Sequence, residues 1–94
     1  MLPRIKAVVP KDNYLLFVEF EDERKVLYDV KNDIESLTDF QALLSEKGLF
    51  QKVRIDPSRT CVFWTDRIDL PSDIILKYGK PAWWQIPGHA GDDN

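Results

Sequence analysis

The sequence predicts a small α+β domain: an antiparallel β-meander of two hairpins plus an N-terminal strand, with one or two short helices packed on the sheet. Two pairs of segments alternate between apolar and polar residues, and each pair is joined by a short polar turn, which is typical of β-hairpins. A later segment carries apolar residues at helical spacing. The length of 94 residues suits one domain.

The first hairpin is expected in the N-terminal third of the chain. Residues 5–9 form a short apolar segment that ends at Pro10. Residues 14–20 alternate strongly and are rich in aromatic and branched side chains, which indicates a strand. Both faces of this strand are largely apolar, so we expect a central strand that is covered on both sides. Residues 25–30 alternate again after a polar turn without glycine, and they complete the hairpin.

A single amphipathic helix is predicted next. Residues 31–36 are interpreted as a polar connection, and the helix is expected over residues 39–47. Phe40, Leu43 and Leu44 fall at the spacing i, i+3, i+4, which defines one apolar stripe. Gly48 is expected to end this helix as a C′ glycine. The narrow stripe predicts packing on one side only, against the sheet.

The second hairpin is centred on the sequence Asp56-Pro57-Ser58-Arg59, a strong type I turn signal. Its strands are expected over residues 51–56 and 60–65. A tight turn at residues 66–67, an extended piece at 68–70 and a short helix at 71–77 follow, since proline suits the first turn of a helix. We therefore place the single domain at residues 1–79.

Residues 80–94 form a C-terminal tail of different character. Ala82-Trp83-Trp84-Gln85-Ile86 is strongly apolar, whereas Gly88 and the residues after it are small and polar. We expect the end of this tail to be disordered.

Composition excludes some classes of protein. The net charge is −3 and the isoelectric point is near 5.0, which argues against a general nucleic-acid binder and against attraction to a membrane surface. Cys61 is the single cysteine, so no internal disulfide forms. The N-terminus lacks the apolar run of a signal peptide, and no apolar stretch is long enough to span a bilayer. We expect a cytoplasmic protein with no membrane partner.

Several motifs resemble a bacterial family, domain of unknown function 2442 (DUF2442). The likeness covers residues 3–78 and rests on patterned hydrophobic positions: Pro3-Arg4-Ile5-Lys6 with Val8; Tyr14-Leu15-Leu16 with Val18 and Phe20; Asp29-Val30; Phe50, Val53 and Ile55; residues 60–64; and Ile68-Asp69-Leu70-Pro71-Ser72-Asp73. Two departures are the first hairpin turn, which lacks the glycine often present there, and the tryptophan-rich tail.

The resemblance implies a small α+β fold and no known activity. Some relatives carry an added helix-turn-helix domain, and others are encoded beside a second small protein, which suggests toxin–antitoxin or other two-gene modules. The tail of this chain is too short to hold such a DNA-binding domain, so that role is not carried over.

Groups able to perform chemistry are sparse. Asp66, Asp69 and Asp73 are the densest carboxylates, but their spacing fits no calcium loop, and turn and helix-start roles explain two of them better. His89 lies in the tail that we expect to be disordered, where a general base has no fixed geometry. Cys61 is interpreted as a small core residue. We predict no catalytic residue, no metal site and no cofactor.

Binding residues are predicted in two places. Neighbouring side chains in an extended chain point in opposite directions, so Trp83 and Trp84 either form a lid on the sheet or leave one ring for a partner, and Trp64 is added to this partner-binding set. Arg54, Arg59 and Arg67, with Trp64 for stacking, offer a nucleic-acid contact, although a solvated hairpin face is the plainer explanation.

The leading functional prediction is therefore a non-enzymatic protein-interaction module, with a protein partner or a second copy of itself, in keeping with one half of a two-gene, toxin–antitoxin-like pair. The first alternative is a regulatory protein that contacts nucleic acid. The second is a metal-binding enzyme that uses the three aspartates.

Overall fold

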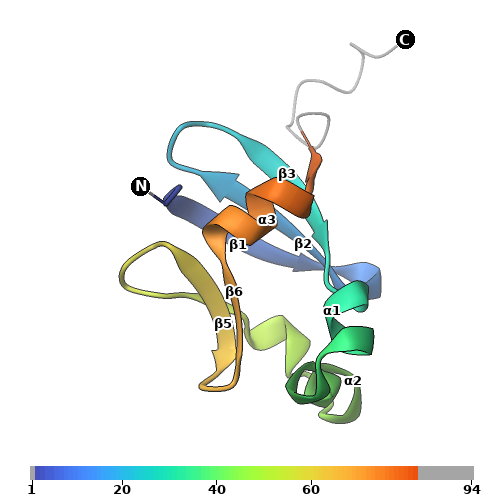
Figure 1. Cartoon of the computed structure of the whole chain (residues 1–94). Helices are drawn as coiled ribbons and strands as arrows, with labels where there is room; N and C mark the ends of the chain where they lie inside the picture. The colour runs from blue at the N-terminus through green and yellow to red at the C-terminus, as the bar shows by residue number, and fades with distance from the viewer. Residues whose placement is uncertain (1, 83–94) are drawn as a thin grey trace, which may run out of the picture.

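The computed structural model describes residues 2–82, which form two antiparallel sheets and several short helices (Figure 1). The first sheet has the strand order β1-β2-β3-β7, with β1 at Ile5–Lys11, β2 at Leu15–Phe20, β3 at Lys25–Asp29 and β7 at Lys80–Pro81. The second has the order β4-β5-β6, with β4 at Arg54–Ile55, β5 at Cys61–Thr65 and β6 at Ile68–Pro71. The predicted α+β class is confirmed, but the strands form two sheets rather than one meander.

The first hairpin forms as predicted, with β2 between β1 and β3. The strand β1 continues through Pro10, where the sequence predicted an end. Proline is tolerated because β1 is an edge strand and the missing N–H faces no neighbour. In the hairpin turn, Glu23 adopts a positive φ of 78°, and the Asp22 carboxylate accepts the Arg24 N–H at 3.1 Å. Side-chain hydrogen bonding thus shapes a turn that lacks glycine.

The helical segment after β3 differs from the prediction. The residues interpreted as a polar connection form helix α1, Lys31–Ser36, and the expected helix at 39–47 is split into the 3₁₀ helix η2, Thr38–Gln41, and the short helix α2, Ala42–Ser45. Leu44 is 56% exposed and does not belong to the core. Gly48, with a φ of 80°, lies in a turn closed by the hydrogen bond from Leu49 N–H to the Glu46 carbonyl, beyond the end of α2.

The second hairpin keeps its predicted turn, since Arg59 N–H donates to the Asp56 carbonyl at 2.7 Å. Its first strand is much shorter than predicted, because the 3₁₀ helix η3, Phe50–Lys52, takes the place of the first residues. The extended piece and the short helix that follow are both present as β6 and α3, Ser72–Tyr78.

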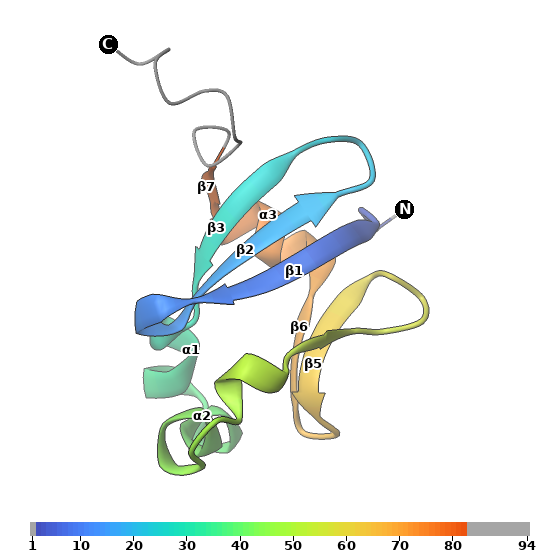
Figure 2. The ribbon, with the colours of Figure 1, turned by 180° about the vertical axis from the view of Figure 1, so that it is seen from behind.

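Helix α3 lies on one face of the first sheet, as both ribbon views show (Figures 1 and 2). After α3 the chain returns to this sheet, where β7 pairs with Val26 and Leu27 of β3. The ordered sheet therefore extends beyond residue 79, where the sequence placed the end of the domain.

One hydrophobic core joins both sheets and α3. The inner face of the first sheet supplies Leu16, Val18 and Phe20, which are fully buried, and the second sheet supplies Val62 and Trp64. Two main-chain hydrogen bonds tie the second hairpin to its neighbours: Ile5 N–H donates to the Arg59 carbonyl at 2.7 Å, and Ser72 N–H donates to the Thr60 carbonyl at 2.9 Å. No helix within residues 2–82 is long and apolar enough to cross a membrane.

Candidate interaction surface

The first sheet has one face turned away from α3, which we call the outer face (Figure 2). It is formed by Ala7, Val9, Leu15, Phe17 and Leu27, which alternate along their strands with the core residues. Val9 is 42% exposed, and the other four are partly exposed. The expectation that β2 is covered on both sides is wrong within residues 2–82, because no described element lies against this face.

Three of these side chains form a continuous row across the strands. Val9 lies directly opposite Phe17, and Phe17 lies directly opposite Leu27. Side chains of directly opposite residues share a face and lie about 4.5–5.5 Å apart at their Cβ atoms. Lys80 of β7 extends the row beyond Leu27. The row is thus a band of apolar contact area three strands wide with a cation at one end.

Lysines surround this band. The Glu19 carboxylate lies 3.6 Å from Lys6 Nζ and 3.4 Å from Lys25 Nζ, so two cations share one anion. Lys11 Nζ lies 5.9 Å from the centroid of the Phe17 ring, within cation–π distance. Within the described chain, neither Lys11 nor Lys80 lies within 4 Å of a carboxylate. The Asp29 carboxylate, opposite Leu15, is paired with Lys31 Nζ at 3.2 Å, so the lysines outnumber the carboxylates and the outer face is locally basic on a chain whose net charge is negative.

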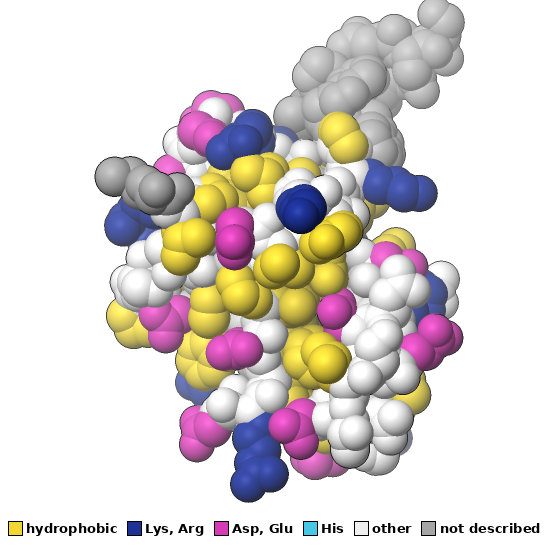
Figure 3. All heavy atoms as spheres, in the orientation of Figure 1, with side chains coloured by type: hydrophobic (Ala, Val, Ile, Leu, Met, Phe, Trp, Pro, Cys, Tyr) yellow, Lys and Arg dark blue, Asp and Glu magenta, His cyan; other side chains and the backbone are white. Residues whose placement is uncertain are grey.

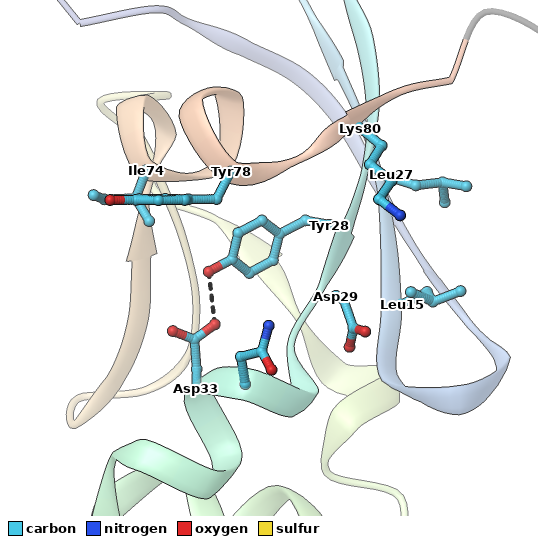
Figure 4. Close-up of a pocket in the computed structure, with 9 residues that line it drawn as sticks. Leu15, Leu27, Tyr28, Asp29, Asp33, Ile74, Tyr78 and Lys80 are labelled. Carbon is cyan, nitrogen blue, oxygen red and sulfur yellow. Dashed lines mark hydrogen bonds between the residues drawn. The ribbon is translucent and has the colours of Figure 1, made fainter.

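A pocket of about 610 Å³ adjoins the outer face at the β3 edge (Figure 4). Leu15, Leu27 and Lys80 line it from the outer side, whereas Tyr28 and Tyr78 line it from the side of α3. The pocket exists because β7 pairs with only two residues of β3, so the edge beyond Leu27 is left open. Unpaired strand edges are ready sites for contact with another chain.

A partly buried hydrogen bond holds the inner wall of this pocket in place. The Tyr28 hydroxyl donates to the Asp33 carboxylate at 2.7 Å and so joins β3 to α1. Burial of the phenol, and then the neighbouring Asp33 carboxylate, raise the pKa of Tyr28 above its ordinary value of 10.0. The phenol therefore stays neutral at physiological pH and serves as a structural donor.

The opposite side of the molecule is more mixed in character. Around α3, hydrophobic side chains also reach the surface, but acidic side chains are interspersed among them (Figure 3). Tyr78, which is 64% exposed, belongs to this side. On the outer face, by contrast, the row Val9, Phe17, Leu27 contains no carboxylate.

The structure describes only one of the three tryptophans predicted to bind a partner. Trp64 is only 4% exposed, its Nε1–H donates to the Phe50 carbonyl at 2.9 Å, and its ring packs against the rings of Phe40 and Phe50. Trp64 is therefore a core residue, and its inclusion among the partner-binding residues is corrected. Trp83 and Trp84 lie outside the described residues.

The three arginines predicted for nucleic acid do not form one patch. Arg59 precedes β5 and Arg67 follows it, so the length of that strand separates them. The Arg59 guanidinium is engaged by the Glu21 carboxylate at 3.2 Å and the Lys6 carbonyl at 2.9 Å. Arg54 lies over the Phe63 ring at 5.0 Å. Arg54 and Arg59 therefore each interact with different neighbours.

The predicted chemical residues are also dispersed. Asp66 lies in the turn after β5, Asp69 lies opposite Phe63 in the second sheet, and Asp73 lies in the first turn of α3. Residues 2–82 contain no group of three or more His, Cys, Asp or Glu side chains able to hold a metal ion. Burial, followed by the nearby carboxylates of Asp69 and Asp56, raises the pKa of the Cys61 thiol, which disfavours the nucleophilic thiolate. His89 lies outside the described residues.

The fold and surface define a small α+β domain built from two antiparallel sheets, one of which has an apolar face that no element of residues 2–82 covers. The chain belongs to the family described as protein of unknown function DUF2442, whose model matches residues 5–81. This match confirms the resemblance seen in the sequence, and it ends at the last residue of β7. No curated protein and no solved structure matches the chain significantly.

Proposed function

We propose that this protein is a non-enzymatic interaction module that binds another protein through the outer face of its first sheet. The single observation that carries the proposal is the row of exposed Val9 and partly exposed Phe17 and Leu27. Contiguous apolar surface on a soluble domain marks contact sites, because its burial against a partner removes it from water. The surrounding lysines favour a partner that carries carboxylates around an apolar strip.

The chemistry of this face supports binding rather than catalysis. Aliphatic side chains and a phenylalanine ring neither transfer protons nor attack a substrate, whereas they supply the contact area on which association depends. The same role suits one half of a two-gene pair, since such a partner is made beside the module and covers its apolar face.

Nucleic-acid contact is the less favoured alternative. Stacking plus phosphate neutralisation needs several cations along one groove, but Arg59 is paired with Glu21 and stands at the opposite end of β5 from Arg67. Asp69 lies next to Phe63, where a phosphate would meet a negative charge.

The test compares two matched phenylalanines. Phe17 and Phe63 each lie partly exposed in the middle strand of a sheet, but only Phe17 belongs to the outer face. Full-length wild type, Phe17→Ser and Phe63→Ser are immobilised, proteins from the encoding organism are captured, and the affinity of a purified partner is then measured by calorimetry. Loss of a buried Phe side chain removes about 1.5–3 kcal/mol, so Phe17→Ser is expected to weaken binding by about tenfold or more.

Phe63→Ser is expected to bind the same partner with wild-type affinity. Equal binding by Phe17→Ser, or a loss confined to Phe63→Ser, contradicts the assignment of the outer face. Capture that depends on nucleic acid and disappears after nuclease treatment favours the alternative instead.

A further inference from the structure

The chain leaves the first sheet beside the apolar row of the outer face. Lys80 lies directly opposite Leu27, and Ala82 N–H donates to the Lys25 carbonyl at 2.8 Å. Ala82 is thus anchored two residues along β3 from Leu27. The residues that follow Ala82 therefore begin about 7 Å from the apolar row, measured along the direction of the strands.

The sequence that follows is suited to an apolar surface. Trp83, Trp84 and Ile86 come directly after Ala82, and Pro87-Gly88 then interrupts the apolar run. Each tryptophan can bury about 150–250 Å² on contact with a surface. In the sequence, these apolar residues directly follow Ala82, the last described residue, which is bonded to the first sheet.

The reach of this segment matches the width of the row. The row crosses three strands, which places its ends about 10 Å apart at a strand spacing of about 4.8 Å. Residues 83–86, when extended at about 3.3 Å per residue, span about 13 Å. Because Ala82 lies in line with β7, one strand beyond Leu27, the extended segment reaches across Leu27 to Phe17, about 10 Å away over two strand spacings.

The charge of the C-terminal tail is opposite to that of the lysines around the outer face. The only charged side chains in residues 83–94 are the carboxylates of Asp92 and Asp93. Lys11, at the opposite end of the outer face from Ala82, lies opposite Leu15 and has no carboxylate within 4 Å in the described chain. An acidic end to the tail thus complements the basic rim of the face.

We propose that residues 83–86 dock on the outer face of their own molecule, with whichever indole of Trp83 and Trp84 faces the sheet packed against Phe17 and Leu27, and that a partner must displace this segment. The docking itself stands on the geometry of the sheet, whereas the regulation rests on the proposed function because it takes the outer face as the partner's site. Docking within one molecule requires no encounter between chains, so it persists on dilution.

The docking is tested by NMR on the full chain. Through-space contacts are expected between the indole protons of Trp83 or Trp84 and the protons of Phe17, Leu27 or Val9. Phe17→Ser is expected to abolish these contacts and to shift tryptophan emission to longer wavelength, whereas the matched Phe63→Ser leaves both unchanged. The double substitution Trp83→Ala/Trp84→Ala provides a second readout, namely a shift of the Leu27 and Val9 methyl resonances, with no change at Leu44.

Indole protons without any contact to the outer face, together with unshifted Leu27 and Val9 methyl resonances in the double variant, overturn the docking. Contacts that vanish on dilution also overturn it, because they assign the segment to a second copy. Regulation is tested separately with the captured partner, for which Trp83→Ala/Trp84→Ala is expected to raise affinity several-fold. Docking without any partner bound at the outer face would disprove the proposed function alone, and a weaker partner affinity in the double variant would disprove the regulation.

Discussion

The indole of Trp64 is bonded through Nε1–H to the main-chain carbonyl of Phe50 over 2.9 Å. This bond fastens β5 to the 3₁₀ helix η3, which precedes β4. The Phe50 ring is stacked on Trp64 at 5.9 Å and meets the edge of Tyr14 at 5.1 Å. Through these rings, the second sheet is packed against the start of β2.

Removal of the indole N–H is expected to destabilise the domain. In Trp64→Phe, the Phe50 carbonyl loses its donor in a buried position, which costs about 1–3 kcal/mol before any loss of packing. Urea unfolding followed by circular dichroism measures the change. The exposed substitution Leu44→Ala serves as the control and is expected to stay within about 0.5 kcal/mol of wild type. A Trp64→Phe protein as stable as this control would show that the hydrogen bond contributes nothing.

Two adjacent leucines in β2 test which face of the sheet is covered. Leu16 is fully buried, so Leu16→Ala is expected to lower the free energy of unfolding by about 2–5 kcal/mol. Leu15 lies on the outer face, so Leu15→Ala is expected to lower it by about 1 kcal/mol or less. Chemical denaturation of the two variants gives the comparison directly. Equal losses would mean that both faces of β2 are equally packed.

The bond between Tyr28 and Asp33 predicts a pH dependence. Because the pKa of Tyr28 is raised above 10.0 in the fold, the phenol stabilises the folded state fully below that pH. This contribution is lost as the pH rises from 10 towards the folded pKa. Tyr28→Phe is expected to lower stability by about 1–2 kcal/mol at pH 7. Above pH 10, the free energy of unfolding of Tyr28→Phe should fall less steeply with pH than that of wild type. Urea unfolding at pH 7 and above pH 10 measures both effects.

Two serines differ in whether their hydroxyl has a partner. The Ser72 hydroxyl is fully buried and has no hydrogen-bond partner within residues 2–82, whereas the Ser58 hydroxyl lies 2.8 Å from that of Thr60. Ser72→Ala removes a desolvated polar group, so it is expected to raise the melting temperature or leave it unchanged. Ser58→Ala is expected to lower it. Calorimetric melting decides between these outcomes, and a clear loss of stability in Ser72→Ala would contradict the first.

The elements that the sequence predicts well are those with strong local signals. Alternation of apolar and polar residues predicts the strands of both hairpins, and Asp56-Pro57 predicts the turn of the second. Pro71-Ser72 predicts the start of α3. Helix α1 was missed because Ile34 is its only buried residue, so the segment shows no apolar periodicity. Its start is instead stabilised by the Asp29 carboxylate, which accepts the Lys31 N–H at 2.9 Å.

Other features depend on long-range packing and leave no local pattern. The strand β7 has only two residues, one of which is proline, and it is defined entirely by its pairing with β3. The apolar character of Leu15 and Phe17 is visible in the sequence, but alternation alone does not say whether a second layer covers them. Likewise, Trp64 as a residue type suits an interface, whereas the surrounding Phe40 and Phe50 make it part of the core.

The pairing of Val26 with Pro81 has a consequence for biosynthesis. The first hairpin leaves the ribosome well before α3 and β7, which at about 5–20 residues per second follow several seconds later. During that interval the inner side chains of β2 and β3 lack the Ile75 packing that later covers them. The nascent chain therefore exposes apolar side chains of β2 and β3, to which chaperones bind, until β7 pairs with β3.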